Sequence, residues 1–582
     1  MGKIKVLDEK TRLKIAAGEV VQNPASVVKE LLENAIDANA TKIEINIQKG
    51  GKQLIEVIDN GMGMSPDDAE LAFQRYSTSK ISDISDLETI HTLGFRGEAL
   101  ASIAAVSHVE LITKTKENPI GTRIVVRESK VITIEDAVRA DGTTVRVKNL
   151  FFNVPARLKF LKTSKAEFQI ILDIVSHYSL HYAPIHFTLT HDGAKILESP
   201  ASTTRLDKIF HIYGKDIAKN MIPINYVTPL LQISGFISKP VIQRGTRKFY
   251  TIFVNNRLIK SKLIIDAIDD AYKTILPKNR HPLVVISLDL DPSMIDVNVH
   301  PTKQEVKFSQ EPLIYDTLRK IILDSFDREK LIPKVEIKES EKAKLIQKEK
   351  SPSSPKTVIT VQQKLIKPSK VPVPPKEPES ISPTPTPTAK LPPMKIIGQV
   401  HELFIIAADS ENLYIIDQHA AHERIMFEKF LKKLEHDPLQ TQTLLSPITI
   451  ELPLQDTVNL PSKLAILKDF GFEIEPFGKT TYRITKLPII LGKTVKREEI
   501  PLIIDELLQK IDPNSKKIPS RVEIAQLYGC KAAIKAGDKL TLSQMENLYH
   551  DLQKTDNPYV CAHNRPTIII FPKSELERKF HR

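Results

Sequence analysis

Three polar side chains near the start of the chain recur at helical spacing. Glu30, Asn34 and Asp37 occupy positions i, i+4 and i+7 of NPASVVKELLENAIDANATKIEI, so a helix places them on one stripe. A carboxylate on that stripe can take a proton from water, and an amide oxygen can bind Mg²⁺. Taken alone, however, the stripe is better explained as the solvated face of an amphipathic helix.

Two glycine-rich turns follow, each at the end of a predicted element. LIEVIDNGMGM reads as a strand that ends near Asp59 and continues into Gly61 and Gly63, where glycine permits positive φ and close approach to a ligand. The turn at 94–97 leads into the apolar segment ALASIAAV, and amide groups at such a turn favour phosphate oxygens. The segment YSTSK at 76–80 lies between the turns. One such turn has little specificity, but the four elements in this order indicate a phosphate-binding pocket.

The C-terminal part of the chain carries a second set of possible ligands. LYIIDQHAAHERIMFEKFLKKL reads as a strand running into an amphipathic helix, with Asp417 at the junction. His419 and Glu423 are four residues apart and share a helix face, so they can close on one metal ion. Cys561 and His563 are two residues apart and on a strand point the same way. These donors suit Zn²⁺, or Mn²⁺ on the carboxylate side, although each segment alone is better explained as a polar helix start or an unrelated thiol.

The elements that must position these groups are visible in the surrounding sequence. Asn23 can cap a helix whose first residue is Pro24, and residues 42–47 and 54–58 alternate as strands do. The C-terminal part opens with two apolar runs, ELFIIAA and NLYIID, before its helical segment. We therefore expect a mixed α and β architecture in both halves of the chain.

A segment of different composition separates the two halves. Residues 336–395 are rich in Lys, Pro, Ser and Thr and contain no aromatic residue, so they cannot bury enough apolar area to offset the entropy of ordering. We expect a flexible linker at 332–395, with a Pro-rich recognition motif as the less favoured alternative. The folded units are then expected at 1–205, 206–331 and 396–582.

Bulk composition narrows the class of protein. The 582 residues are too many for one core, and 41% hydrophobic with 26% charged residues is ordinary for a soluble globular protein. The net charge of +12 suits a polyanion such as DNA, although solubility alone explains such a surplus more often. The two cysteines, Cys530 and Cys561, exclude a disulfide framework and favour a reducing compartment. No segment approaches the roughly 20 apolar residues of a membrane span, and no secretory signal is apparent, so we expect a cytoplasmic protein.

Four motifs carry a family resemblance. E-L-x-E-N-A-I-D-A, D-N-G-x-G-M, Y-S-T-S-K and G-F-R-G-E-A-L resemble the ATP-binding motifs of the GHKL superfamily, in the forms used by the MutL family of mismatch-repair proteins. The likeness continues through GTTVRVKNLFFNVPARLKFL at 142–161 and DVNVHPTKQEVKF at 296–308. FVNNR at 253–257 has Asn256 where the family usually has Gly, and because Asn tolerates left-handed backbone we expect the turn to survive. The resemblance covers 1–330 strongly and 396–582 well.

The resemblance implies a multidomain protein of α+β and α/β architecture. It comprises a GHKL (Bergerat) ATPase sandwich, a second α/β domain with the left-handed crossover of a ribosomal-protein-like fold, the linker, and an α/β C-terminal dimerisation and endonuclease domain. With ATP and Mg²⁺ bound, Glu30 would be the general base and Asn34 would ligate Mg²⁺. Asp59 would receive the adenine amino group, and Lys303 would stabilise charge on the γ-phosphate. The other implied ATP contacts are Asp37, Gly61, Gly63, Met64, Thr78, Ser79, Lys80, Gly94, Phe95, Arg96, Gly97, Glu98, Ala99, Leu100 and Thr143.

The C-terminal segments resemble those of MutL proteins that nick DNA. D-Q-H-A-x2-E-x4-E at 417–428, with G-C-K and C-A-H-N-R-P, implies metal-assisted phosphodiester hydrolysis in which Asp417 and Glu423 are catalytic. The implied ligands of the Zn²⁺ or Mn²⁺ ion are Asp417, His419, Glu423, Cys530, Cys561 and His563. Gly529, Lys531, Ala562 and Asn564 replace the family's usual Ala, Arg, Pro and Gly. None of these departures removes a ligand, although lysine at 531 weakens a bidentate phosphate contact.

Partners follow from the same resemblance. A homodimer, DNA and a MutS-type mismatch-recognition protein are implied. Gln442, Leu445 and Pro447 of QTLLSP resemble the Q-x-x-L-x-P peptide that binds the replication sliding clamp, although so short a motif also arises by chance. Candidate DNA contacts are Arg257, Lys260 and Lys262, for which a solvated basic surface explains each residue equally well. Two rival functions stay open: a non-nicking MutL matchmaker with a structural metal site, and another GHKL machine such as a topoisomerase or chaperone, for which we find no tyrosine-bearing cleavage domain.

Overall fold

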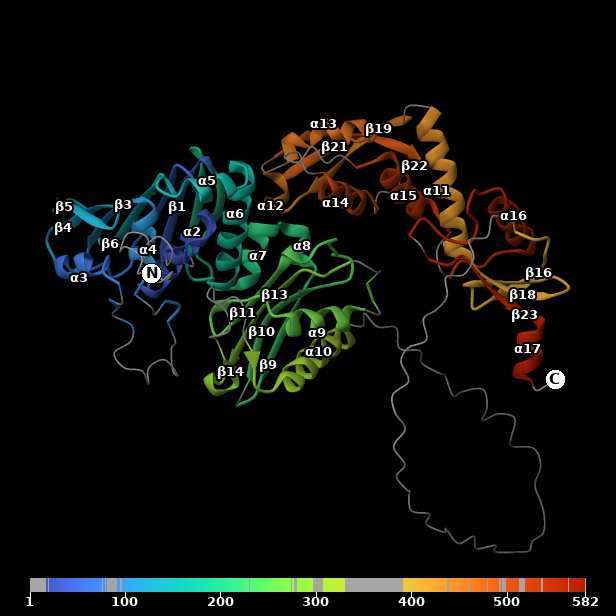
Figure 1. Cartoon of the computed structure of the whole chain (residues 1–582), viewed down its shortest axis with the longest axis horizontal. Coiled ribbons are helices and arrows are strands. Elements are labelled where there is room, and N and C mark those ends of the chain that lie inside the picture. Colours follow the sequence, from blue (N-terminus) through green and yellow to red (C-terminus); the bar gives the residue numbers. More distant parts are fainter. Residues whose placement is uncertain are drawn as a thin grey trace, which may run out of the picture.

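The structure is a computed structural model of the whole chain (Figure 1). It describes residues 17–18, 20–75, 77–78, 80, 92–94, 97–229, 231–273, 275–276, 280–296, 307–329, 391–436, 439–458, 460–478, 480–490, 493–494, 499–511, 519–534, 537–563 and 565–580. Most of the predicted linker at 332–395 therefore lies outside the described residues. The others form mixed α and β units on either side of it, which confirms the predicted fold class.

An eight-stranded sheet packed against helices forms the first part of the chain. Its strand order is β5-β4-β3-β6-β2-β1-β7-β8, and the β1–β7 pair is parallel while the other pairs are antiparallel. Alternate residues of each inner strand are buried and join the apolar face of α2 and α6 in one core. The predicted strands at 42–47 and 54–58 are confirmed as β1 and β2. The bounds are α2 Pro24–Asp37, α3 Pro66–Leu71, α4 Ala99–Val106, α5 Pro155–Phe160, α6 Ser164–His181, β1 Lys42–Gln48, β2 Leu54–Asp59, β3 His108–Lys114, β4 Gly121–Arg127, β5 Lys130–Ala137, β6 Gly142–Lys148, β7 His186–His191 and β8 Ala194–Ser199.

A five-stranded sheet covered by two helices forms the second part. The strand order is β12-β11-β13-β10-β9, with a parallel β11–β13 pair, and α9 and α10 pack on it in a separate core. A smaller apolar cluster joins α7 to the end of α6, so the first two parts are packed together. The bounds are α7 Arg205–Tyr213, α8 Lys215–Lys219, α9 Lys262–Tyr272, α10 Glu311–Arg328, β9 Met221–Val227, β10 Leu231–Ser238, β11 Tyr250–Val254, β12 Arg257–Leu258, β13 Val284–Leu290, β14 Ile295–Asp296 and β15 Lys307–Phe308.

The C-terminal part has two cores that share the long helix α11. Ala421 and Ile425, near the start of α11, pack on the sheet β16-β17-β18-β23, and Phe427 and Phe430 pack against the second lobe around β21. Figure 1 shows α11 running between the lobes. The first lobe contains β16 Lys395–Val400, β17 Phe404–Ala408, β18 Asn412–Asp417, α11 Gln418–His436, α16 Leu542–Gln553, β23 Ile568–Pro572 and α17 Lys573–Lys579. The second contains β19 Thr441–Glu451, α12 Leu454–Thr457, α13 Leu464–Asp469, β20 Glu473–Pro476, β21 Thr481–Ile490, β22 Lys493–Thr494, α14 Ile500–Lys510 and α15 Arg521–Ala532.

Two sequence predictions about this part are confirmed. The apolar runs ELFIIAA and NLYIID form β17 and β18, and the helical segment that follows forms α11. Among the described residues, no helix combines the length and apolar character needed to cross a membrane.

Candidate functional site

Helix α2 presents the predicted polar stripe to a large cavity. Asn23 caps the helix by accepting a hydrogen bond from the Ser26 backbone N–H, as predicted. Glu30, Asn34 and Asp37 all line a cavity of about 1460 Å³, so the stripe faces this cavity rather than the outer surface of the protein. The other predicted nucleotide contacts on its wall are Asp59, Gly63, Met64, Thr78, Lys80, Gly94, Gly97, Glu98, Ala99, Leu100 and Thr143.

Asp59, at the end of β2, is fixed as a hydrogen-bond acceptor. Its Oδ1 accepts hydrogen bonds from the backbone N–H of Gly61 at 2.8 Å and of Thr143 at 3.2 Å. Arg139, which the sequence analysis missed, donates from Nη2 to the Asp59 main-chain carbonyl at 2.8 Å. Burial raises the pKa of Asp59, although the two amide bonds oppose the shift. The carboxylate is therefore immobilised through one oxygen, and the other is left for a ligand.

Glycine is required at position 63, in the turn that follows β2. Gly63 has φ 71°, and a Cβ there would lie 2.1 Å from the Lys114 carbonyl oxygen. Gly61 contributes its N–H to Asp59 rather than a surface to the cavity wall. The remaining predicted contacts, Ser79, Phe95, Arg96 and Lys303, lie outside the described residues.

A buried network behind Glu30 was not predicted from the sequence. The hydroxyl of Tyr178 on α6 donates to Glu33 Oε1, and Lys29 Nζ lies 3.0 Å from the same oxygen. Burial lowers the pKa of Lys29, but the carboxylates of Glu33 and Glu30 outweigh it, so the pKa is raised. The network ties α2 to α6 and therefore fixes the helix that carries Glu30. In the sequence, the only sign of this network is the charged residue Glu33 itself.

The FVNNR turn brings the second part of the chain to the cavity. Asn255 and Asn256 have φ 46° and 64°, which confirms that the turn tolerates asparagine in place of glycine. Arg257 Nη2 donates to the Thr92 carbonyl at 3.1 Å, and Lys260 lines the cavity. Lys262 is exposed and pairs with Asp266. The contacts of these three basic residues with DNA stay a prediction.

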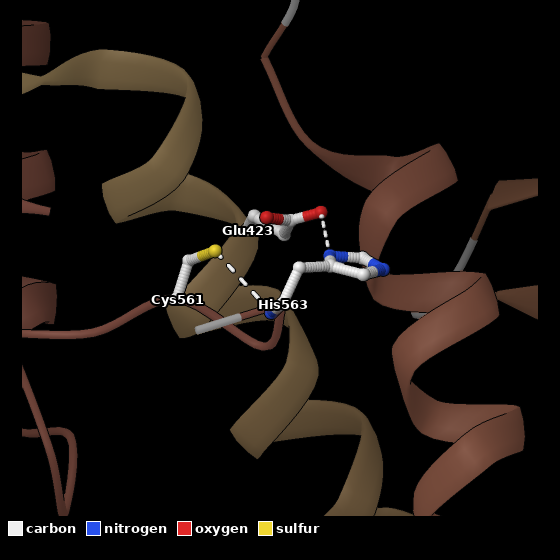
Figure 2. Close-up of side chains that lie close together, drawn as sticks. All are labelled: Glu423, Cys561 and His563. Atoms are coloured by element: carbon white, nitrogen blue, oxygen red, sulfur yellow. Dashed lines mark hydrogen bonds and ion pairs between the residues drawn. The ribbon is translucent and has the colours of Figure 1, made fainter. Parts of the chain in front are cut away.

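Three of the predicted metal ligands converge in the C-terminal part. The ligand atoms of Glu423, Cys561 and His563 all lie within 4.8 Å of one another (Figure 2). Glu423 projects from α11, while Cys561 and His563 lie in the loop before β23. His563 Nδ1 lies 2.8 Å from Glu423 Oε1, and the His563 backbone N–H donates to Cys561 Sγ at 3.3 Å. Hydrogen bonding to Cys561 and Glu423 raises the pKa of His563 to about 9.

Two further predicted ligands lie at the start of α11, outside this group of three. Asp417 Oδ1 accepts hydrogen bonds from the backbone N–H of His419 and Ala420 at 2.9 and 3.0 Å, so it caps the helix. His419 Nδ1 donates to the Ile534 carbonyl at 2.7 Å, and His422 Nδ1 accepts from the Ile534 backbone N–H at 2.8 Å. The donation leaves His419 Nε2 as the nitrogen with a free lone pair.

The last acidic residue of the motif has a structural role. Glu428 accepts the backbone N–H of Asp556 at 2.8 Å and pairs with Arg424, so it holds the loop that leads to Cys561. Arg565, to which the sequence analysis gave no role, places Nη2 at 3.2 Å from Glu423 Oε2. Cys530 belongs to α15, but its side chain lies outside the described residues.

The predicted clamp peptide lies at an irregular edge. Residues 441–443 of β19 pair with β21, and the ladder is interrupted between Thr443 and Ile448. Leu445 lies in the interruption and is fully exposed, and Gln442 and Pro447 are exposed as well. The interruption with its exposed leucine is accessible to a partner, and binding of the sliding clamp there stays a prediction.

Three family models match successive parts of the chain. Residues 22–141 match the histidine kinase-, DNA gyrase B- and HSP90-like ATPase. Residues 209–327 match the DNA mismatch repair protein, C-terminal domain, and residues 397–540 match the MutL C terminal dimerisation domain. The matches follow the same order as the nucleotide cavity, the second sheet and the metal-ligand group.

Curated relatives match over the full length of the chain. The DNA mismatch repair protein MutL of Clostridium acetobutylicum is 38% identical, with 100% of both chains covered. That of Geobacillus sp. is also 38% identical over 100% of both chains, and that of Halothermothrix orenii is 35% identical over 99% of both. Among solved structures, the N-terminal domain of a DNA repair protein is 28% identical, covers 55% of this chain and 98% of its own, and has a TM-score of 0.48. The ADP-complexed MutL ATPase domain of Aquifex aeolicus is 25% identical, covers 52% and 98%, and has a TM-score of 0.37.

Proposed function

Because this chain belongs to the MutL family of DNA mismatch repair proteins, we propose that it is an ATP-regulated endonuclease that nicks DNA at its C-terminal metal site. The observation that carries the proposal is the convergence of Glu423 with Cys561 and His563, which lie more than a hundred residues further along the chain. The family membership accounts for an ATPase domain and a dimerisation domain. Nicking is the additional activity that the convergence supports.

The donor set fits a borderline divalent cation. A thiol sulfur, an imidazole nitrogen and a carboxylate oxygen together suit Zn²⁺, and the carboxylate also suits Mn²⁺. Glu423 is completely buried, and its carboxylate forms ion pairs with His563 and Arg565. A buried carboxylate is costly unless it is paired or bound to a metal, so the position is suited to a cation. When bound, such an ion supplies a more acidic water molecule and offsets charge on the phosphate.

The chain's own residues would orient the substrate around that ion. Asp417 is held by two backbone amides at the helix start, so its second oxygen keeps a fixed direction. The bond from His419 to Ile534 fixes the tautomer that leaves Nε2 available as a ligand. Arg565 is 44% exposed next to Glu423 and can contact a phosphate oxygen.

We assign ATP hydrolysis to the cavity beside α2 on the same family membership. Glu30 would take the proton of the attacking water, since it lines the cavity on a helix fixed by the Glu33 network. Asn34 would ligate the Mg²⁺ ion that accompanies ATP, and Asp59 would accept the adenine amino group. Lys303 would contact the γ-phosphate from the second part of the chain. We expect nucleotide binding and hydrolysis to regulate the nicking site.

One face of the first C-terminal sheet suits a second copy of the chain. Alternation along β17, β18 and β23 places apolar side chains on the outer face, and cross-strand pairs Ile406–Ile415, Ile415–Ile569 and Leu413–Phe571 make it continuous. Each of these side chains is half-buried or exposed in the single chain. An apolar sheet face of this kind marks an interface, and the matched dimerisation domain favours a homodimer through it.

Further partners are DNA, a MutS-type mismatch-recognition protein and the replication sliding clamp. The first two rest on the family, and the third on the exposed Leu445 in the interruption of β19. With these partners, the protein would act in the cytoplasm, and on the nucleoid when it is bound to DNA.

A plasmid-nicking assay tests the proposal. With Mn²⁺ and supercoiled plasmid, Asp417→Asn and Glu423→Gln should lose nicking while ATP hydrolysis is retained. The matched control is Asp551→Asn, because Asp551 is an acid of the same lobe that pairs with Lys429 on the surface, and it should nick as the unaltered protein does. Normal nicking by Asp417→Asn would show that the assigned site is wrong. Absence of nicking by the unaltered protein with any metal would favour the matchmaker alternative.

A second assay tests the ATPase assignment. Glu30→Ala should bind nucleotide but fail to hydrolyse it, because the cavity stays intact while the proton acceptor is lost. Undiminished turnover would exclude Glu30 as the general base. Omitting Mg²⁺ should stop hydrolysis in the unaltered protein.

A further inference from the structure

Asp37, the last residue of α2, holds three groups of the phosphate-binding segments at once. Its Oδ1 accepts the backbone N–H of Leu93 at 3.0 Å, and its Oδ2 accepts that of Gly94 at 3.1 Å. Lys80 Nζ lies 2.5 Å from the same Oδ2. The Asp37 side chain is only 7% exposed, so these contacts are made in a largely water-free setting where charge-assisted hydrogen bonds are strong.

The ammonium of Lys80 also occupies the neighbourhood of the Mg²⁺ ligand. Lys80 Nζ donates to Asn34 Oδ1 at 3.3 Å and therefore bridges Asn34 and Asp37. Asn34 is the residue expected to bind the cation that accompanies ATP. A side-chain cation thus binds an oxygen of Asn34 and an oxygen of Asp37, both of which line the cavity.

These contacts conflict with the binding of a triphosphate. The Gly94 N–H and the Lys80 ammonium are the groups that phosphate oxygens require, and both are directed at a carboxylate. A backbone N–H makes one good hydrogen bond, so a phosphate oxygen must replace Asp37 as its acceptor. The charge of Asp37 also repels an approaching phosphate.

The second part of the chain fastens the same segment. Arg257 Nη2 donates to the carbonyl of Thr92, the residue before Leu93. The turn that carries Arg257 is itself anchored to α6, because His181 hydrogen-bonds to the Asn256 side chain at 3.0 Å and Tyr182 donates to the Asn256 carbonyl at 3.1 Å. Residues 92–94 are therefore held from both parts of the chain.

We propose that Asp37 is a positioning residue that acts as an internal competitor for the nucleotide phosphates, and that Arg257 secures the same segment from the second part of the chain. Nucleotide binding exchanges Asp37 for phosphate oxygens at Lys80 and Gly94. The exchange frees the segment at 92–94 from α2 and changes its contact with Arg257. This inference rests on ATP binding in the cavity, which the unaltered protein must show in the same experiment.

Asp37→Asn in the full-length chain tests the competition. The amide keeps one acceptor oxygen but loses the charge that holds Lys80, so we expect a non-hydrolysable ATP analogue with Mg²⁺ to bind about tenfold more tightly. KM for ATP should fall by a similar factor. Asp37→Glu retains the charge and should bind within about threefold of the unaltered protein. Unchanged or weaker binding by Asp37→Asn would overturn the proposal.

A matched control comes from another acid on the cavity wall. Asp68 also lines the cavity but accepts a hydrogen bond from the Ser65 hydroxyl at the start of α3. Asp68→Asn should leave nucleotide affinity within about twofold of the unaltered protein. An equal tightening in this variant would show that general loss of negative charge, rather than release of Lys80 and Gly94, causes the effect.

Hydrogen exchange gives a readout that does not depend on activity. Without nucleotide, the amides of Leu93 and Gly94 should exchange at least about fivefold faster in Asp37→Asn than in the unaltered chain. With the ATP analogue bound, the two proteins should become alike, because phosphate then protects the Gly94 amide in both. Unchanged exchange in the nucleotide-free variant would show that Asp37 does not hold the segment.

A double-mutant cycle tests the part played by Arg257. Arg257→Gln and Asp37→Asn act on adjacent residues of one short segment, so their effects on nucleotide affinity should be non-additive by at least about threefold. Strict additivity would overturn the role of Arg257 and leave that of Asp37. Failure of the unaltered protein to bind the analogue would instead overturn the ATP site on which the inference rests.

Discussion

The substitution Asp59→Asn should change which purine the cavity binds. In the structure, Asp59 Oδ1 accepts the backbone N–H groups of Gly61 and Thr143. An asparagine at this position keeps those two bonds through its carbonyl oxygen. Its NH₂ group then replaces Oδ2, so a donor faces the adenine amino group where the aspartate offers an acceptor. The perturbation is confined to one atom, since the shape of the side chain is conserved.

The expected loss of ATP affinity is large. A hydrogen bond to a charged acceptor contributes about 1.5–3 kcal/mol, and a buried donor left facing another donor costs about 1–3 kcal/mol. Asp59 is 6% exposed, so water cannot replace the lost partner easily. The two terms together correspond to about 10²- to 10⁴-fold weaker ATP binding. A 6-oxopurine nucleotide such as ITP presents an acceptor at the same place, and its binding should improve in the variant.

Titration calorimetry with ATP and ITP analogues measures both changes on the full-length protein. Binding of ATP within about threefold of the unaltered protein, or equal losses for ATP and ITP, would refute the reasoning. The pH dependence adds a further check. Burial raises the pKa of Asp59, so the charged acceptor is lost at a higher pH than for an ordinary aspartate. ATP affinity of the unaltered protein should therefore fall on acidification through that pKa, and the variant should lack this dependence.

Three further predictions concern stability and assembly. Tyr178→Phe should lower the free energy of unfolding of the nucleotide-binding part by about 1.5–3 kcal/mol, because buried Glu33 loses a charged hydrogen bond. Tyr182→Phe loses a neutral hydrogen bond and should lower it by only about 0.5–1.5 kcal/mol. Equal losses in chemical denaturation would contradict this prediction. Burial lowers the pKa of the fully buried Lys208 from 10.5 to about 8, so the folded chain loses this proton at a lower pH than the unfolded chain does. The unaltered protein should thus gain about 3 kcal/mol relative to Lys208→Met between pH 8 and 10.5, and a pH-independent difference would disprove it. Ile569→Asp on the outer sheet face should weaken dimerisation by at least about 100-fold in light scattering without unfolding the chain, because a charge replaces an exposed apolar side chain that the dimer would bury. An intact dimer would place the interface elsewhere.

Local features of the nucleotide site could be predicted because they lie within single elements. Asn23 and Pro24 specify the start of α2, and the helical period alone places Glu30, Asn34 and Asp37 on one face. The strand that ends at Asp59 could be predicted for the same reason. What the sequence could not reveal was the partner of each group, since Arg257 and Thr92 are 165 residues apart and Tyr178 and Glu33 are 145 apart.

The metal site shows the same division more sharply. The motif at 417–428 and the segment containing Cys561 and His563 could be recognised separately, and six ligands were expected. The structure brings together Glu423, Cys561 and His563 and leaves Asp417 and His419 at the helix start. It also gives Glu428, which the motif contains, a role in holding the loop to Cys561.

The sequence by itself determined the order of the elements, the direction of side chains within each element and, through its motifs, the family. Only the tertiary structure decided which of these side chains meet, because the distance between two elements depends on how their apolar faces pack. Packing of α6 on α2 gives Glu33 its partner, and packing of the FVNNR turn against α6 brings Arg257 to Thr92. The helix α11 joins both C-terminal cores and carries Glu423 to Cys561 and His563. The periodicity of a helix or strand determines the directions of its side chains. The burial of apolar surface between elements determines which of those side chains meet in a site.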